Sequence, residues 1–307
     1  MSKLFPNISI TGDLGSGKST ISSIIARKLN FQFFSIGEIQ RQLAIKYNMT
    51  ILEFNNYIKT HPEIDIELDN TLTDLGNTKK CIIFDSRMAW HFVPNSFKIC
   101  LIVDLDIAAE RIINAKRGMV ETYSNKNEAK EKLIERRKIE KDRYLRAYNK
   151  DITLDTNYDL IIDTSFSSPE QISNIIISTL TDWHNNKYIN NFWLAPKRLY
   201  PTLNTIRNLD SQLIDNLSVS ISKEGLNKNP IIVFRLDQDY FIYDGHHRTA
   251  ASILNNLGLI PISLLKNKTV SNITLEEFVK GNVSLSLIYD WEKVCKFKYI
   301  KYPEYVV

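Results

Sequence analysis

Between residues 7 and 177, short apolar runs rich in β-branched residues alternate with long amphipathic stretches. This alternation is typical of a parallel sheet covered by helices, and continuous apolar runs favour strands that are buried on both faces. The predicted strands are residues 8–11, 81–85, 99–103 and 160–163. The predicted helices are residues 19–29, 38–47, 128–148 and 169–180, the last with Ser168 as N-cap.

The pattern changes after a polar, Asn-rich stretch. Residues 182–191 show no clear period, so we place a linker at 182–192 between domains 1–181 and 193–307. The second domain begins with apolar positions at helical spacing, which predict a helix ahead of Gly225. After it we expect a hairpin of 230–236 and 240–243 around 237–239, a helix over 249–257 and a strand over 260–265. This order predicts a smaller α+β domain.

Composition excludes several classes of protein. Apolar residues make up 43% of the 307 residues and charged residues 24%, which argues against a disordered or fibrous chain. The 39 Lys and Arg against 35 Asp and Glu give a net charge of +4, too small to predict nucleic-acid or membrane binding by itself. Three distant cysteines predict neither a zinc site nor a disulfide framework.

No apolar run approaches the ~18–20 residues that cross a bilayer. The first strand begins so early that it leaves no room for a signal peptide. We therefore expect a cytoplasmic protein without a membrane partner.

One motif predicts a phosphate-binding loop. Residues 12–19, GDLGSGKS, match G-x-x-x-x-G-K-[ST] directly after an apolar strand and before a helix. Glycines let such a loop turn backbone N–H groups onto phosphate oxygens, and the helix N-terminus adds its dipole. We expect Lys18 to reach the β- and γ-phosphates of ATP, and Ser19 to ligate Mg²⁺. The predicted ATP-binding residues are Gly12, Gly15, Ser16, Gly17, Lys18, Ser19 and Thr20.

Two further segments of this domain are candidates for binding the phosphoryl acceptor. Ser35, Gly37 and Arg41 follow a second hydrophobic segment, where Arg41 would present its guanidinium to a second phosphate. After the strand at 81–85, we expect Asp85 to hold Mg²⁺ through water and Arg87 to face the acceptor phosphate.

Two charge clusters each have two interpretations. Asp65 and Asp69 lie four residues apart on one helical face, which suits either a solvated acidic face or acceptor recognition. Residues 121–150 carry ten basic and six acidic side chains. We interpret most of these as a solvated helix with i,i+4 pairs and keep two arginines as functional.

A set of stretches in this half of the chain resembles a known family. In order they are 8–29, SIGEIQRQLA (35–44), LEF (52–54), HPEIDIELD (61–69), FDSR (84–87), DRYLRAYNKDI (142–152) and YDLIIDTS (158–165). Their order and spacing over residues 7–180 resemble the archaeal-type cytidylate kinases, which are P-loop nucleoside monophosphate kinases.

The resemblance implies a core parallel sheet, an acceptor-binding segment near residues 35–70 and a mobile lid that carries arginines. It implies Arg41 and Arg87 at the CMP phosphate, Asp65 and Asp69 near the nucleoside, Arg136 and Arg143 at the transferring phosphoryl group, and Arg111 at the start of the lid. The chain departs from the family at Ser86, where Gly is expected, and over residues 118–127, which are longer and more polar. These departures bear on lid geometry and on the identity of the acceptor.

A second constellation, Asp244-Gly245-His246-His247-Arg248, lies at a predicted strand-to-helix junction. Such a junction collects anions, because N–H groups and a helix dipole meet there. We expect it to bind phosphate or nucleotide. Adjacent histidines without a third ligand do not predict a metal site.

The stretches LAPKRLYPT (194–202), NPIIVF (229–234) and YDGHHRTAA (243–251) resemble the ParB/sulfiredoxin-like superfamily over about residues 193–266. The resemblance implies that Asp244, Gly245, His246 and Arg248 hold nucleotide phosphates. No Cys precedes His246, which excludes sulfiredoxin chemistry. Leu203-Asn204 stands where the serine kinases of this superfamily place a catalytic Glu, which argues against serine phosphorylation. The alternating residues 296–299 predict a half-buried strand rather than a base-stacking surface.

The sequence thus predicts an α/β fold, a P-loop NTPase parallel sheet with flanking helices, joined to a smaller α+β ParB/sulfiredoxin-like domain. The leading hypothesis is an ATP- and Mg²⁺-dependent kinase that acts on a pyrimidine nucleoside monophosphate, CMP or dCMP first. We expect catalysis to depend on Lys18, Arg41, Arg87, Arg136 and Arg143. One alternative is a kinase for a modified or nucleic-acid-borne nucleotide. Another is a kinase regulated by a C-terminal module that binds nucleotide or nucleic acid.

Overall fold

The structure is a computed structural model that describes residues 5–58, 60–114, 123–202, 210–224, 229–267, 269–270, 272–303 and 305–306. Its contacts divide the chain into two compact units, Met1–Ile189 and Asn190–Val307. Within the described residues, no helix is both long and apolar enough to cross a membrane. The predicted departures at residues 118–122 and at Leu203-Asn204 lie outside the described residues.

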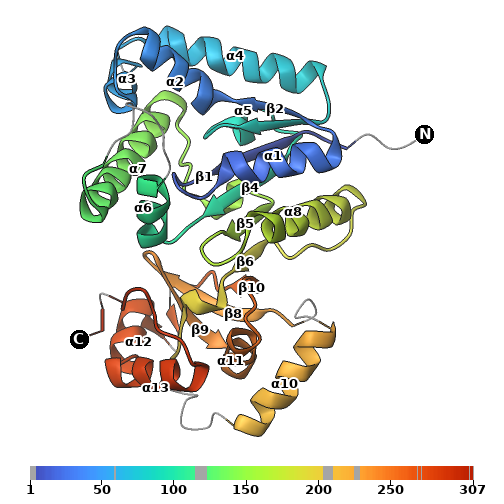
Figure 1. Ribbon diagram of the computed structural model, residues 1–307, viewed down its shortest axis with the longest axis vertical. Coiled ribbons are helices and arrows are strands. Elements are labelled where there is room, and N and C mark those ends of the chain that lie inside the picture. The colour runs from blue at the N-terminus through green and yellow to red at the C-terminus, as the bar shows by residue number, and fades with distance from the viewer. Residues whose placement is uncertain are drawn as a thin grey trace. The chain divides into compact units, whose positions relative to one another are not determined.

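The N-terminal unit is built on a parallel sheet, as predicted. Its strands pair in the order β2-β3-β1-β4-β5, and every pairing is parallel (Figure 1). The strands are β1 (Ile8–Gly12), β2 (Gln32–Ser35), β3 (Ile82–Asp85), β4 (Phe97–Ile102) and β5 (Leu160–Asp163). β1, β3 and β5 are buried along their whole length, which accounts for their continuous apolar sequences. β2 is absent from the predicted strands, and its four residues are only partly buried or exposed.

Helices flank this sheet. They are α1 (Lys18–Leu29), α2 (Ile36–Lys46), α3 (Ile51–Ile58), α4 (Pro62–Thr78), α5 (Ala89–Phe92), α6 (Leu105–Asn114), α7 (Lys126–Tyr148) and α8 (Pro169–His184). α1 packs beside α8, and α6 packs beside α7 (Figure 1). The Ser168 side chain caps α8 in a capping box with Gln171. Because α8 continues to His184, the first residues of the predicted linker are helical.

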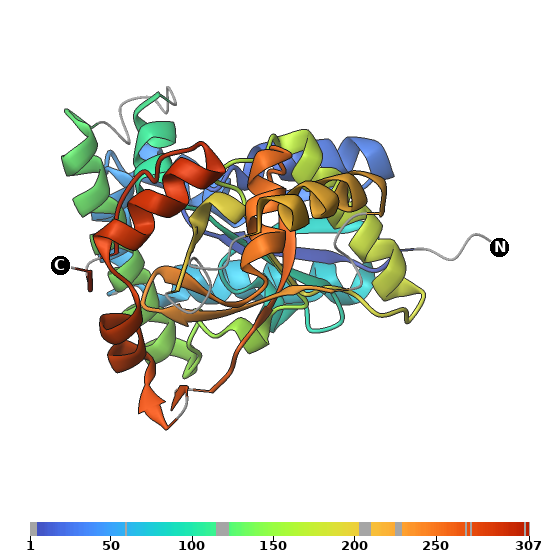
Figure 2. The ribbon, with the colours of Figure 1, turned by 90° about the horizontal axis from the view of Figure 1, so that it is seen from below.

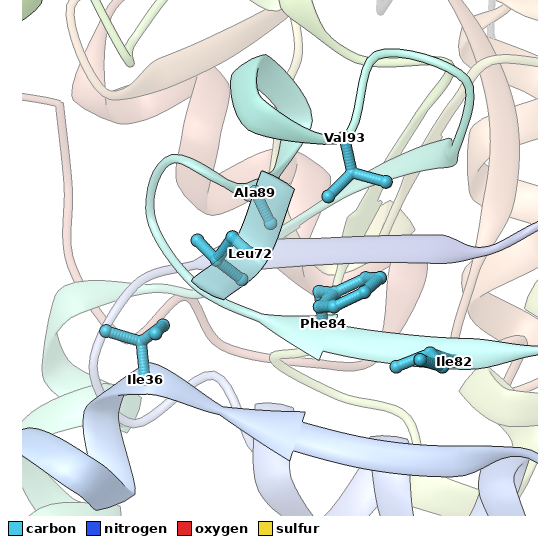
Figure 3. Close-up of a cluster of buried hydrophobic side chains, with 6 residues drawn as sticks. All are labelled: Ile36, Leu72, Ile82, Phe84, Ala89 and Val93. Atoms are coloured by element: carbon cyan, nitrogen blue, oxygen red, sulfur yellow. The ribbon is translucent and has the colours of Figure 1, made fainter. Parts of the chain in front are cut away.

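A buried hydrophobic cluster fixes the end of β3 (Figure 3). Its members are Ile36, Leu72, Ile82, Phe84, Ala89 and Val93. They come from α2, α4, β3 and the α5 segment, and Phe84 is 0% exposed. Because this core packs β3 against α5, it sets the position of residues 85–88 between them.

The C-terminal unit has a mixed sheet with the strand order β6-β10-β8-β9-β7. Its strands are β6 (Phe192–Leu194), β7 (Leu199–Tyr200), β8 (Ile231–Leu236), β9 (Asp239–Asp244) and β10 (Ile260–Leu264). The β8·β9 and β6·β10 pairs are antiparallel, whereas β8·β10 and β7·β9 are parallel. The predicted hairpin is therefore β8–β9.

Helices and a small hairpin complete this unit. They are α10 (Ser211–Glu224), α11 (His246–Leu254), α12 (Leu275–Asn282), α13 (Leu285–Cys295) and the pair β11 (Thr269–Val270) and β12 (Ile273–Thr274). α10 lies beside α11 (Figure 1 and Figure 2). α11 begins three residues earlier than predicted, directly after Gly245 in the left-handed region with a φ of 101°.

The predicted strand at residues 296–299 is wrong. Lys296 adopts a left-handed conformation as the C-cap of α13, and the residues after it form no strand. Tyr299 is buried against Tyr200, with 4.7 Å between the ring centroids. Its hydroxyl donates to the Leu199 carbonyl. The alternation of Lys and aromatic residues therefore reflects an irregular segment with one buried ring.

Candidate active site

The phosphate-binding motif forms a tight loop between β1 and α1. Gly12 has a φ of 146°, and a Cβ there would lie 2.2 Å from the Leu101 carbonyl oxygen, so only glycine fits. Gly17, with a φ of 80°, is the N-cap of α1 and has no side chain to cap the first N–H groups of the helix. The Ser16 hydroxyl donates to the Asp13 carbonyl at 2.7 Å. The loop therefore presents a helix N-terminus whose N–H groups are available to an anion.

Lys18 lies against its own loop. Its Nζ donates to the Gly12 carbonyl at 2.8 Å and to the Asp13 carbonyl at 3.3 Å. Burial, together with the nearby Arg87 charge, lowers the pKa of Lys18 to about 8. A phosphate group would supply the negative charge that this ammonium lacks. Ser19 and Thr20 are exposed in the first turn of α1.

The segment after β3 lies next to this loop, because β3 and β1 are neighbouring parallel strands. Asp85 is 7% exposed, and its Oδ2 accepts a hydrogen bond from the Ser35 hydroxyl at 3.2 Å. Ser35 is the N-cap of α2, so this contact connects the two predicted acceptor segments. Ser86 Oγ accepts from the Met88 N–H. Arg87 follows and points to α7.

α7 brings charged side chains to the loop. Arg87 Nε lies 2.8 Å from Glu140 Oε2, and Arg136 Nε donates to Glu140 Oε1 at 2.9 Å. Burial by itself would raise the pKa of Glu140, but the two guanidinium groups hold it at about 2. Arg137 Nη2 lies 2.8 Å from the Asp13 carboxylate in the phosphate-binding loop.

These side chains surround one pocket, which we call the transfer pocket. It is lined by Asp13, Leu14, Arg87, Leu105, Ala108, Leu133, Arg136 and Arg137. Three guanidinium groups and the phosphate-binding loop therefore meet at one place. This concentration of positive charge suits a phosphoryl group in transfer.

The predicted lid residue Arg143 is buried one turn beyond Glu140 on the same face of α7. It is 9% exposed, its Nη1 donates to Asn55 Oδ1 at 3.2 Å, and its Nη2 donates to the Tyr144 hydroxyl at 2.6 Å. Its Nε lies 4.0 Å from Asp65 Oδ2. The structure therefore groups Arg143 with residues of α3 and α4, in the predicted acceptor segment.

Asp69 lies one helical turn from Asp65 and accepts a hydrogen bond from the Tyr148 hydroxyl. Burial raises the pKa of Asp69 to about 6, the Tyr148 hydrogen bond opposes this, and the Asp65 charge adds to it. Burial also raises the pKa of Asp65, opposed by Arg143. The two acids thus face α7 and are not a freely solvated surface.

Two of the predicted arginines make local or structural contacts. Arg41 pairs with Glu38 one turn earlier in α2, at 2.7 Å, and Gly37 lies beside it. Arg111 donates to the carbonyls of Gly15 and Thr164, which braces the phosphate-binding loop against the end of β5. The contacts of Arg111 therefore support the phosphate-binding loop.

No sequence motif pointed to Glu140, Arg137 or Asn55 as residues of the site. Arg136 and Glu140 are four residues apart on α7, a spacing that signals an ion pair. The contacts of Arg137 with Asp13 and of Arg143 with Asn55 join distant segments and leave no local signal.

The second constellation forms the start of α11. Gly245 is its N-cap and supplies no capping side chain. Arg248 donates to the carbonyls of Asn229 and Pro230 and to Asp244 Oδ2 at 2.7 Å. Arg248 therefore ties β8 and β9 to the helix, and its partner Asp244 is exposed.

The two histidines at the start of α11 accept hydrogen bonds from backbone N–H groups. His246 is 2% exposed, and its Nε2 accepts from the Thr202 N–H at 3.1 Å. Burial lowers the pKa of His246 to about 4, so its ring is neutral. His247 Nε2 accepts from the Asp210 N–H at 3.3 Å. The His246 ring is therefore turned into the core, away from the helix N-terminus.

The C-terminal unit matches a known domain. Residues 193–278 match the family model of the ParB N-terminal domain.

Several proteins are similar to the N-terminal half of the chain. A cytidylate kinase from Methanobrevibacter smithii is 33% identical over 173 residues, which cover 56% of this chain and 97% of that protein. A cytidylate kinase from Archaeoglobus fulgidus is 34% identical, over 56% of this chain and 93% of that protein. An S-adenosylmethionine-dependent nucleotide dehydratase from Lacinutrix mariniflava is 36% identical over 55% of this chain, which spans only 35% of that longer protein.

The family model of the cytidylate kinase-like family matches residues 7–166, just over half of the chain. The match includes the phosphate-binding loop, β3 with Arg87, and α7 with Glu140 and Arg143. The chain therefore belongs to the cytidylate kinase-like family.

Proposed function

We propose that this kinase transfers the γ-phosphoryl group of ATP to a pyrimidine nucleoside monophosphate, with CMP or dCMP as the preferred acceptor. The observation that carries the proposal is the transfer pocket, where Arg87, Arg136 and Arg137 meet the phosphate-binding loop. Two relatives that share this region, from Methanobrevibacter smithii and Archaeoglobus fulgidus, are named cytidylate kinase.

In the proposed reaction Lys18 exchanges its loop carbonyls for the β- and γ-phosphates of ATP. Phosphate oxygens bind an ammonium more strongly than neutral carbonyls do. The arginines of the transfer pocket receive the charge that spreads over the transferring phosphoryl group. Positioning and charge stabilisation supply most of the rate in such reactions.

The polar groups near the loop fit Mg²⁺. Mg²⁺ prefers oxygen ligands and is usually held by one or two carboxylates together with substrate phosphates. Asp85 offers a buried carboxylate, and Ser19 offers an exposed hydroxyl at the start of α1. When bound, Mg²⁺ would neutralise charge on the phosphates of ATP.

The acceptor nucleoside is proposed to lie between α7 and the acidic side chains of α4. Cytosine presents an exocyclic amine that donates hydrogen bonds, and a ring nitrogen and a carbonyl that accept them. Asp65 supplies an acceptor, and the buried Arg143 supplies donors, including an Nε that has no hydrogen-bond partner among the described residues. Uracil would turn a carbonyl toward Asp65, which favours cytosine.

An ADP-release assay across ribo- and deoxynucleoside monophosphates tests the proposal. We expect turnover with CMP or dCMP that disappears in Lys18→Ala and persists in Lys46→Ala, whose side chain is exposed on α2. Asp65→Asn should reduce the preference for CMP over UMP. If no monophosphate is turned over above the Lys18→Ala background, free nucleotides are not the acceptor.

The same assay with labelled ATP and oligonucleotides tests the alternative acceptor. Transfer to a polymer but not to CMP would favour a nucleic-acid-borne acceptor. The match of the C-terminal unit to the ParB N-terminal domain motivates this experiment.

We further propose that the C-terminal unit binds phosphate or nucleotide at the N-terminus of α11. The supporting observation is Gly245, which leaves the first N–H groups of α11 uncapped beside Arg248. Calorimetry of the full chain with a nucleotide should show a site that Lys18→Ala retains and Arg248→Ala loses. Salt concentration must be fixed, because phosphate contacts depend on it.

A further inference from the structure

Glu140 is a buried acid that no motif predicts and that contacts two arginines at once. It is 6% exposed and lies on α7. One of its carboxylate oxygens contacts Arg87 and the other contacts Arg136, at 2.8 and 2.9 Å. A carboxylate used in this way fixes two side chains that come from distant parts of the chain.

The two arginines line the transfer pocket, and Glu140 lies behind them. Both contacts are made through Nε, the inner nitrogen of the guanidinium group. A guanidinium has five N–H donors in a fixed fork, and only one of them is on Nε. The contact with Glu140 uses one donor of Arg87, a residue that lines the transfer pocket, and leaves the other four for a substrate phosphate.

Other carboxylates compete with Glu140 for Arg87. Asp13 and Asp85 both lie close enough to Arg87 to raise its pKa. Without Glu140, the Arg87 guanidinium would be drawn toward these acids of the loop and of β3. Its Nη edge would then be occupied by the protein itself.

We propose that Glu140 is a positioning residue for phosphoryl transfer, which holds Arg87 and Arg136 so that their guanidinium groups face the transfer pocket. The inference rests on the proposed function, because the phosphate that the arginines would receive belongs to the substrates.

The direction in which anion affinity changes when Glu140 is removed distinguishes a positioning role from simple neutralisation of the arginines. If Glu140 only neutralised the arginines, its removal would make the transfer pocket more positive and strengthen anion binding. If Glu140 positions the two arginines, its removal weakens anion binding, because Arg87 turns to the other acids. A purely structural role would change thermal stability without changing the affinity of the folded protein.

Inorganic tripolyphosphate is a suitable probe, and its binding to the full chain can be measured by calorimetry at fixed salt. We compare the unmodified protein with Glu140→Gln, which keeps the shape and loses the charge. Glu140→Asp keeps the charge, but it is one methylene too short to reach both arginines. Glu135→Gln is the matched control, because Glu135 is exposed on the same helix and pairs with Lys132 one turn away.

We expect both Glu140 variants to bind tripolyphosphate at least ~10-fold more weakly, since charged hydrogen bonds are lost. Glu135→Gln should bind within about twofold of the unmodified protein. Equal or tighter binding by Glu140→Gln overturns the proposal, as does an unmodified protein that binds no tripolyphosphate. If Glu140→Gln fails to fold by circular dichroism, Glu140→Asp decides the question.

Turnover of CMP by the unmodified protein separates this proposal from the proposed function. An inactive protein whose Glu140 variants bind tripolyphosphate weakly would refute CMP as acceptor and leave the positioning role standing. An active protein whose variants bind tripolyphosphate normally would overturn only the role of Glu140.

Discussion

Replacing Lys18 with Met should abolish phosphoryl transfer and yet stabilise the folded protein near neutral pH. Burial and the Arg87 charge lower the pKa of Lys18 from 10.5 to about 8. The charged ammonium of Lys18 therefore lowers the stability of the folded protein. Methionine keeps a similar length and removes the charge.

The magnitude follows from the pKa. Each pKa unit corresponds to about 1.36 kcal/mol, so the charged form costs the folded state up to ~3 kcal/mol below pH 8. Met also loses the hydrogen bonds from Nζ to the carbonyls of Gly12 and Asp13, together about 1–3 kcal/mol. The net gain expected at pH 7 is on the order of 1 kcal/mol, or about 2–4 °C in Tm for a unit of this size.

The pH dependence has a definite sign. Between pH 8 and 10.5 the unfolded chain keeps the Lys18 proton while the folded protein releases it, so the stability of the unmodified protein rises with pH. The gain in stability of Lys18→Met over the unmodified protein should therefore disappear by pH 10. Only the lost hydrogen bonds then remain, and they make the variant the less stable protein.

Differential scanning calorimetry of the full chain at pH 7 and pH 10 measures this crossover. Lys46→Met, on the exposed face of α2, is the control and should show no crossover. In parallel, Lys18→Met should lose CMP turnover by ~10²-fold or more. A Tm that falls by several degrees at pH 7, or a gain that persists at pH 10, would refute the argument that the Lys18 charge is held at a cost.

Three further changes test other parts of the structure. Gly12→Ala places a Cβ 2.2 Å from the Leu101 carbonyl oxygen, so we expect a loss of ~3 kcal/mol or more in urea unfolding, together with loss of ATP binding. Arg248→Ala should leave CMP turnover within a few-fold while it removes anion binding in the C-terminal unit; a collapse of kcat in a folded variant would contradict two separate sites. The neutral His246 has a pKa of about 4 when folded, so the unfolded chain binds its proton first and stability falls as pH drops from 6.5 to 4. His246→Gln should flatten this acid sensitivity in calorimetric scans, and an unchanged slope would count against a neutral, buried ring.

Elements that depend on neighbours along the chain could be predicted from the amino-acid sequence. The apolar runs at β1, β3, β4 and β5 and the caps of α8 are local, and they identified the parallel sheet and its flanking helices. The phosphate-binding loop could be predicted equally well, because its strand, glycines and helix are contiguous in the sequence. The hairpin β8–β9 was predicted from the same kind of local signal.

Prediction from the sequence failed where charged side chains are buried. α7 is rich in charged residues, so its pattern predicts a mostly solvated helix. The structure instead buries Glu140, Arg143 and Tyr144 on one face, with Ala129 and Leu133. Hydrophobic periodicity cannot identify such a face, because paired charges can be buried when their partners come from other elements.

Contacts between segments far apart in the sequence determine which arginines share a pocket. Arg87 and Glu140 are 53 residues apart, yet they form one ion pair at 2.8 Å. The fold brings them together because the carboxyl ends of parallel strands share one edge of the sheet and α7 passes beside it. Likewise His246, which the sequence offers as a phosphate ligand, is turned inward by the Thr202 N–H. The direction of a side chain depends on what packs around it, and the packing exists only in the folded chain.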